Sequence, residues 1–315
     1  MQQVNDPKTL FERAQKGDRR ALSRLVSVVE NGGNPAREAL RLIWPHTGGA
    51  RILGITGPPG SGKSTLTNAL VKHLRLEGHT VGVIAVDPSS PFTGGAILGD
   101  RIRMSSHALD PGVYIRSMGT RGQLGGLSAA CTGAARLLDA CGFDIILLET
   151  VGVGQSEVAV ARCADVVTVV NVPGLGDDVQ ASKAGILEIG DVFVVNKCDL
   201  PGCDRVVLEL RSMLDMDETG EKRNAPVLKT SASSFIGIPE YAQALDATWK
   251  QFEQRGILQS RRQQRLQSEM LEIMQGEIIR RAALPRPGSE EMEAFLRTNE
   301  NPYTWVDDTL SKILK

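Results

Sequence analysis

The chain has 315 residues, of which 41% are hydrophobic and 23% are charged, so it is long enough to bury a large core. Its 36 Lys and Arg residues nearly balance its 37 Asp and Glu residues, which excludes a global charge that would favour nucleic acid or an anionic membrane surface. No apolar run approaches the roughly 20 residues of a membrane helix, and the first segment resembles neither a secretion signal nor a transit peptide. We therefore expect a cytoplasmic protein without nucleic-acid or membrane partners.

Residues 1–49 are predicted to form a helical N-terminal extension. Leu22, Leu25 and Val29 recur at helical spacing after Asp18, a residue type that caps helix starts. A pair of glycines ends this helix, and a second helix is expected after the Asn-Pro pair that follows.

Short apolar runs separated by amphipathic stretches follow, a pattern typical of alternating β and α units around a parallel sheet. The predicted strands lie near 52–56, 80–86, 113–117, 144–149, 165–172, 191–195 and 226–229. Seven such strands predict one doubly wound, mostly parallel α/β domain, which we assign to residues 50–255.

A glycine-rich segment, GPPGSGKST, joins the first predicted strand to an amphipathic helix and fits the GxxxxGK[ST] pattern of a P-loop. Main-chain N–H groups and the helix start would hold the phosphates, Lys63 would bridge the β- and γ-phosphates, and Ser64 would bind Mg²⁺. A chance glycine-rich turn is the alternative. The segment predicts a P-loop NTPase fold, with the nucleotide held by Gly57, Pro58, Pro59, Gly60, Ser61, Gly62, Lys63, Ser64 and Thr65.

Three acidic residues lie at or near predicted strand ends, where an open α/β sheet exposes its ligand crevice: Asp87, Asp100 and Glu149. With Ser64, they form the predicted Mg²⁺ ligand set. We assign Glu149 to the Mg²⁺ water shell and Asp87 to Mg²⁺ or to the attacking water, so the predicted catalytic residues are Lys63, Asp87 and Glu149. Surface or helix-capping carboxylates are the alternative for all three acids.

The segment from Glu149 to Gly152 resembles the DxxG switch of GTPases, in which the glycine N–H senses the γ-phosphate. Here Glu replaces Asp, and Gln155 follows the glycine by three positions instead of one. Gln155 either positions the attacking water or lies solvated at a helix start.

A second motif predicts recognition of guanine. Asn196, Lys197 and Asp199 fit N-K-x-D after a buried strand. Asp199 could accept hydrogen bonds from guanine N1 and N2, whereas adenine would leave this carboxylate unpaired. Ser231 and Ala232 would complete the pocket. An ordinary turn at a strand end is the alternative.

The five cysteines form no CxxC pair, and only four histidines accompany them. We therefore expect structural thiols in a reducing compartment and no zinc site. These cysteines are Cys131, Cys141, Cys163, Cys198 and Cys203.

Residues 256–315 are predicted to form a helical C-terminal arm. An apolar stripe at helical spacing runs from Leu266 to Ile278 before Pro285 and a further proline interrupt it. This stripe could form a dimer interface or pack against the preceding domain.

The chain closely resembles the MeaB-type GTPases over nearly its whole length. The resemblance rests on the P-loop and, in chain order, on DPSSPFTGGAILGDRIRM, SMGTRGQLGGLS, ETVGVGQSE, PGLGDDVQASKAGILEIGD and NKCD. Members of this family are G-protein chaperones of adenosylcobalamin-dependent acyl-CoA mutases, once labelled lysine/arginine/ornithine transport kinases. The resemblance implies a homodimer that binds GTP or GDP with Mg²⁺, gates cobalamin delivery and protects a methylmalonyl-CoA mutase-type partner.

The resemblance also places Asp87, Asp100 and Glu149 on Mg²⁺ and switch positions. It places Gly176, Asp177 and Asp178 through Lys183 on an additional switch segment that senses the partner. A helix-capping turn is the alternative interpretation of this segment.

Arg121 follows another predicted strand and would either reach phosphate in one switch state or form a structural salt bridge. Two other functions stay open at this point. A metal-delivery GTPase of the nickel-insertion kind would need Cys and His ligands near the nucleotide, and a small-molecule kinase would need an acceptor pocket.

Overall fold

The central feature of the fold is a seven-stranded sheet. The computed structural model describes residues 6–87, 107, 109–119, 126–150, 160–174, 188–216, 222–285, 287–298 and 301–313. The strands are β1 (Arg51–Thr56), β2 (Val81–Asp87), β3 (Val113–Gly119), β4 (Ile145–Thr150), β5 (Val166–Asn171), β6 (Val192–Val195) and β7 (Val227–Lys229). Each lies within two residues of its predicted range, so the sequence-based strand prediction is confirmed.

The strand order shows that the sheet is doubly wound. The order is β3-β2-β4-β1-β5-β6-β7, and every neighbouring pair is parallel. Strands β2, β3 and β4 lie on one side of β1, and β5, β6 and β7 lie on the other, so the direction in which strands are added reverses at β1. In such sheets the ligand crevice lies beyond the carboxyl ends of the strands at this reversal, which here falls beside β1.

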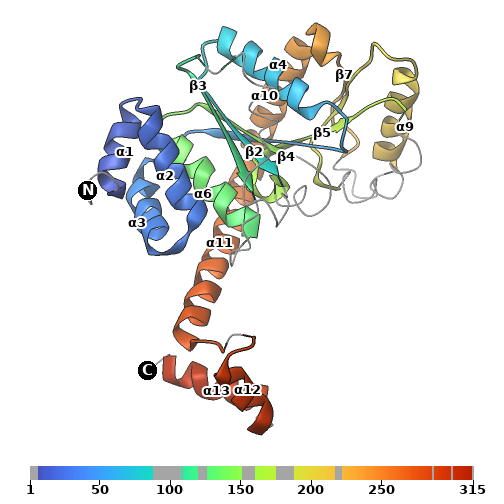
Figure 1. Cartoon of the computed structure of the whole chain (residues 1–315). Helices are drawn as coiled ribbons and strands as arrows, with labels where there is room; N and C mark the ends of the chain where they lie inside the picture. The colour runs from blue at the N-terminus through green and yellow to red at the C-terminus, as the bar shows by residue number, and fades with distance from the viewer. Residues whose placement is uncertain are drawn as a thin grey trace. The chain divides into compact units, whose positions relative to one another are not determined.

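Helices cover both faces of the sheet and make three layers (Figure 1). One face packs against α4 (Lys63–Leu76) and α10 (Ile238–Gln254), and the other against α6 (Gly126–Ala140) and α9 (Cys203–Asp215). The N-terminal helices α1 (Pro7–Gln15), α2 (Arg19–Asn31) and α3 (Gly33–Ile43) belong to the same apolar cluster as α6. Alternating strand side chains fill both interfaces, because both faces of the sheet are buried.

The N-terminal helices follow their local sequence closely. An Asp18 carboxylate oxygen accepts hydrogen bonds from the N–H groups of Arg20 and Ala21, at 2.9 and 3.0 Å, and so caps α2 as predicted. The next helix starts at Gly33, earlier than expected, because the first turn of a helix tolerates proline.

The chain divides into two compact units, Met1–Arg262 and Gln263–Lys315. The helix α11 (Ile257–Ala282) crosses this division, and α12 (Glu290–Thr298) and α13 (Pro302–Ile313) follow it. Among the described residues of the second unit, large apolar side chains are exposed, including Met270, Ile273 and Met274. No helix in the described ranges is long and apolar enough to cross a membrane.

Candidate nucleotide-binding site

The glycine-rich segment forms the loop between β1 and α4, as its sequence context predicts. Strand β1 ends at Thr56 and α4 begins at Lys63. Gly57 has a φ of 142°, and a Cβ at this position would lie 2.2 Å from the Val170 carbonyl oxygen. No other residue fits there, because both the backbone conformation and the approach to β5 exclude a side chain. The loop is therefore held directly against the central strands.

The ammonium group of Lys63 lies inside this loop. Its Nζ donates hydrogen bonds to the carbonyl oxygens of Gly57 at 2.6 Å and Pro58 at 3.0 Å, and the residue is only 6% exposed. A buried cation bound to main-chain carbonyls can exchange these acceptors for stronger, charged ones such as phosphate oxygens. The arrangement thus supplies a positive charge where the predicted phosphate site lies.

Ser64 and Glu149 meet at the carboxyl edge of the sheet. Glu149 lies near the end of β4, beside Ile55 of β1, and is 1% exposed. Ser64 at the start of α4 donates a hydrogen bond from Oγ to Glu149 Oε1 at 2.5 Å. A hydroxyl and a carboxylate side by side are oxygen donors of the kind that Mg²⁺ prefers. Both predicted ligands are therefore adjacent and fit the ion chemically.

Asn196 connects the phosphate loop with the predicted base pocket. Its Nδ2 donates to the Ser61 carbonyl oxygen at 3.0 Å, while its Oδ1 accepts from Thr230 Oγ1 and from the Ala232 N–H, each at 3.1 Å. One buried amide thus uses its donor and its acceptor on two different loops. This network fixes the spacing between the two predicted ends of the nucleotide.

Asp199 lies beside Ser231, whose Oγ donates to Asp199 Oδ1 at 2.6 Å. This hydrogen bond is the main reason that the pKa of Asp199 is lowered from its ordinary value, and the nearby Lys197 charge lowers the pKa further. Lys197 has a positive φ of 58°, which turns the chain sharply after β6. The exposed Asp199 is thus held ionised, as an acceptor of base N–H groups must be.

The cysteine prediction is wrong for two of the five residues. Cys198 and Cys203 are joined by a disulfide, whereas Cys131, Cys141 and Cys163 are free thiols. This pair is not evident from the sequence, because a spacing of five residues fits no familiar motif. The turn after β6 brings the two side chains together, with Cα atoms 5.1 Å apart, a normal separation for a disulfide.

Several predicted residues are outside what the structure describes. For Asp87 only the backbone is described, at the end of β2. The others outside the described ranges are Asp100, Arg121, Gly152, Gln155, Gly176, Asp177, Asp178 and Lys183. Their predicted roles stay predictions.

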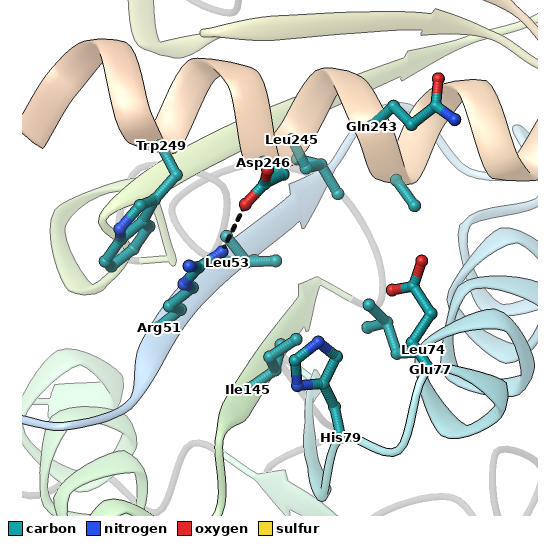
Figure 2. A pocket seen from close by; sticks show the side chains of 11 residues that line it. Arg51, Leu53, Leu74, Glu77, His79, Ile145, Gln243, Leu245, Asp246 and Trp249 are labelled. Atoms are coloured by element: carbon teal, nitrogen blue, oxygen red, sulfur yellow. Dashed lines mark hydrogen bonds and ion pairs between the residues drawn. The ribbon is translucent and has the colours of Figure 1, made fainter.

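A cavity of about 270 Å³ lies at the opposite, amino edge of the sheet (Figure 2). Leu53 and Ile145 contribute to its lining. The Arg51 guanidinium forms an ion pair with the Asp246 carboxylate of α10 at 2.8 Å. The cavity lies beside the start of β1, whereas the glycine-rich loop follows the end of β1, so the cavity is not the nucleotide site. Within the described ranges, no group of three or more His, Cys, Asp or Glu residues could hold a metal ion.

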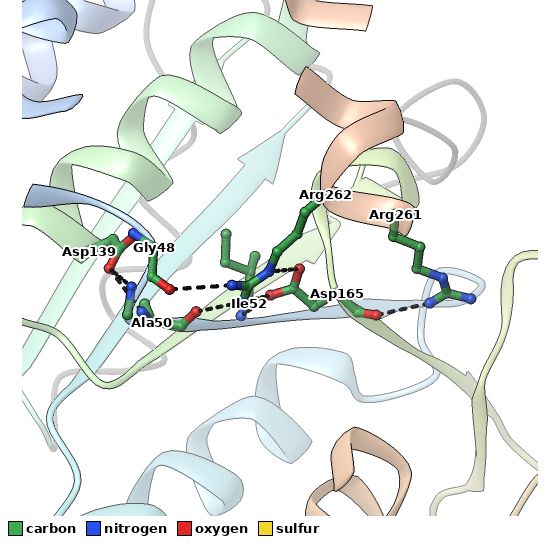
Figure 3. Close-up of polar contacts among 8 residues, drawn as sticks. Gly48, Ala50, Ile52, Asp139, Asp165, Arg261 and Arg262 are labelled. Carbon is green, nitrogen blue, oxygen red and sulfur yellow. Dashed lines mark hydrogen bonds and ion pairs between the residues drawn. The ribbon is translucent and has the colours of Figure 1, made fainter. Parts of the chain in front are cut away.

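Two arginines near the start of α11 bind acidic residues at this amino edge, and Figure 3 shows the contacts of Arg262 with Asp165. Arg262 donates to both carboxylate oxygens of Asp165, at 3.1 and 2.9 Å, and to the Gly48 and Ala50 carbonyl oxygens. Arg261 binds the carboxylate of Asp191 at 2.7 and 2.8 Å. These pairs are not evident from the sequence, because their partners lie 70 to 97 residues apart in the chain.

The doubly wound parallel sheet and the glycine-rich loop after its central strand define a P-loop NTPase. Residues 22–285 match the family described as "Methylmalonyl Co-A mutase-associated GTPase MeaB". A relative from Pyrococcus abyssi is 48% identical over 311 residues, which are 97% of this chain and 96% of the relative. The mouse protein named methylmalonic aciduria type A homolog, mitochondrial, is 34% identical over 282 residues, 84% of this chain and 68% of that protein.

A solved structure titled "Crystal structure of LAO/AO transport system kinase" is similar along the whole chain. It has a TM-score of 0.72 and 26% sequence identity, and the match covers 98% of both chains. The chain belongs to the MeaB family of methylmalonyl-CoA mutase-associated GTPases, and it is a GTPase that binds guanine nucleotides.

Proposed function

We propose that this GTPase is a Mg²⁺-dependent chaperone that gates adenosylcobalamin loading of an acyl-CoA mutase and protects the mutase from inactivation. The observation that carries the proposal is membership of a family described as mutase-associated. The name of the mouse relative, which refers to methylmalonic aciduria, supports the same client class.

In this proposal, the phosphate end of the site is formed by Lys63, Ser64 and Glu149. Lys63 would exchange its main-chain acceptors for the β- and γ-phosphate oxygens. Glu149, whose carboxylate accepts a hydrogen bond from the Ser64 hydroxyl, would stay next to Ser64. Bound Mg²⁺ would neutralise the charge that develops on the phosphates. Ser64, Glu149 and the predicted ligands Asp87 and Asp100 would hold it.

At the base end, Asp199 would accept from guanine N1 and N2, and the Lys197 stem would cover the ring. Ser231 keeps the carboxylate oriented, and the buried Asn196 amide keeps the base end in register with the phosphate loop. The proposed domain organisation is an extension over 1–49, the GTPase domain over 50–255 and an arm over 256–315.

The decisive experiment measures GTP hydrolysis with and without candidate mutases, following inorganic phosphate and GDP together. We expect equal amounts of the two products, because water is the acceptor, and stimulation by one adenosylcobalamin-dependent mutase. An acyl-CoA enzyme without cobalamin serves as the control. If no mutase changes turnover or is retained in a pull-down in any nucleotide state, the chaperone role is refuted.

We also propose that the arm makes a homodimer. Its exposed apolar side chains, among them Met270, Ile273 and Met274, support an interface with a second copy. Deletion of 263–315, which keeps the Arg261 and Arg262 ion pairs of the first unit, should leave a monomer in light scattering. A stable dimer of the shortened chain would contradict this role of the arm.

A further inference from the structure

The proposed base pocket contains a chemical feature that guanine binding does not require. Cys198 is the variable residue of the N-K-x-D segment, and Cys203 is the first residue of α9. Their disulfide closes a small ring that spans residues 198–203. Asp199, the proposed base reader, lies inside this ring.

The ends of the ring are held in place, whereas the residues between them are exposed. At Cys198, the N–H donates to the Thr230 carbonyl oxygen at 3.0 Å, which ties this side to the end of β7. Beyond Asp199, the residues Leu200, Pro201 and Gly202 are all exposed. The disulfide therefore joins the anchored Cys198 to Cys203, which is buried at the start of α9, and it confines the exposed residues between them, including Asp199, to a closed ring.

The two sulfur-bearing residues also differ in access. Cys203 is 7% exposed, whereas Cys198 is only partly buried. Exchange with an external thiol requires contact with one sulfur atom, and access selects which one is attacked. Cys198 is therefore the entry point for a reductant.

We propose that Cys198 and Cys203 form a redox modification site that controls release of the guanine nucleotide. Its co-reactants are a dithiol reductant and, in reverse, a disulfide oxidant. The inference rests on the proposed role of Asp199 in base binding. The closed ring keeps the pocket ordered when it is empty, so binding orders fewer groups and release is slower. Reduction opens the ring and speeds release.

The exchange balances as a two-electron reaction. A thiolate of the reductant attacks Cys198 Sγ, the S–S bond breaks, and the Cys203 sulfur leaves as a thiolate that takes up a proton. The second thiol of the reductant then attacks the mixed disulfide, which frees Cys198 as a thiol after protonation and leaves the reductant as a cyclic disulfide. Oxidised glutathione drives the reverse reaction and is reduced to two thiols.

The test compares one preparation in two redox states. The full chain is treated with dithiothreitol or with oxidised glutathione, and the 198–203 linkage is verified by peptide mass spectrometry. Release of a fluorescent GDP analogue is then followed after a chase with excess GDP. We expect reduction to speed release about 5- to 10-fold, in the usual range for coupling between two sites, and reoxidation to restore the slow rate.

Two variants make the test specific. Cys203→Ser removes one ring partner and should release the analogue at the fast rate under both treatments. Cys141→Ser removes a free thiol and should respond like the unchanged protein. Equal release rates from the two redox states, a persistent response in Cys203→Ser, or absence of the linkage after oxidation would each overturn the inference.

Loss of guanine nucleotide binding in both redox states would overturn the proposed function and the redox control together. Binding in both states with the same release rate would overturn only the redox control.

Discussion

The two edges of the central sheet use charged residues in opposite ways. At the carboxyl edge, Lys63 is hydrogen-bonded to main-chain carbonyl oxygens and Asp199 to the Ser231 hydroxyl, and these are neutral partners that a charged or polar ligand can replace. At the amino edge, the buried carboxylate of Asp165 is enclosed by the Arg262 guanidinium and the Ile52 N–H. The carboxyl edge is therefore suited to chemistry and the amino edge to stability.

The largest expected effect is on catalysis at the carboxyl edge. Lys63→Ala removes the charge that would meet the phosphates, so GTP hydrolysis should fall about 100- to 1,000-fold. Lys72→Ala, which removes an exposed lysine from the same helix, is the matched control and should keep its activity. Turnover of Lys63→Ala within twofold of the unchanged protein would place the phosphate site elsewhere.

The next effect is on folding at the amino edge. Arg262→Gln leaves the buried Asp165 carboxylate without its guanidinium partner, so the free energy of unfolding should fall by about 3 kcal/mol. GDP affinity of the folded variant should not change. Urea unfolding measures the first quantity and fluorescence titration the second, with the exposed Arg255→Gln as control. A variant as stable as the unchanged chain would remove the contrast between the edges.

A more selective effect concerns the base. In Asp199→Asn, an amide replaces the carboxylate and can donate to the C2 carbonyl of xanthine, so GTP affinity should fall about 10- to 100-fold while XTP affinity rises. Competition against a fluorescent nucleotide measures both affinities. Asp204→Asn, whose native side chain is exposed and pairs with Lys229, should keep the preference for GTP. Unchanged GTP affinity in Asp199→Asn would exclude this carboxylate from the pocket.

The smallest effect concerns an exposed pair at the amino edge. Hydrogen bonds from Lys250 and Arg51 lower the pKa of Asp246. A carboxyl with a lowered pKa in the folded state stabilises the protein above its unfolded pKa, and this contribution disappears as pH falls through the folded value. Since Arg51 and Asp246 are about 40% exposed, Asp246→Asn should cost only about 0.5 kcal/mol at pH 7. A loss above 2 kcal/mol would show that this pair behaves like the buried one.

The sequence predicted those features that depend on local pattern. The strands around the sheet and the loop before Lys63 follow from apolar runs and glycine spacing, and the Asp18 cap follows from one residue type. The Asn196 network was not predictable, because it depends on where three loops meet. The pairing of Arg262 with Asp165 joins residues 97 positions apart, and the disulfide depends on the turn that brings Cys203 back to Cys198. No local sequence pattern encodes these contacts.

In the proposed function, one pocket joins a phosphate loop to a carboxylate that selects guanine. The most direct test is a calorimetric titration of the unchanged protein with GTP and with ATP, each with excess Mg²⁺. We expect GTP to bind at least about 100-fold more tightly, since ATP leaves Asp199 without hydrogen-bond donors. Equal affinities for the two nucleotides would contradict this proposal.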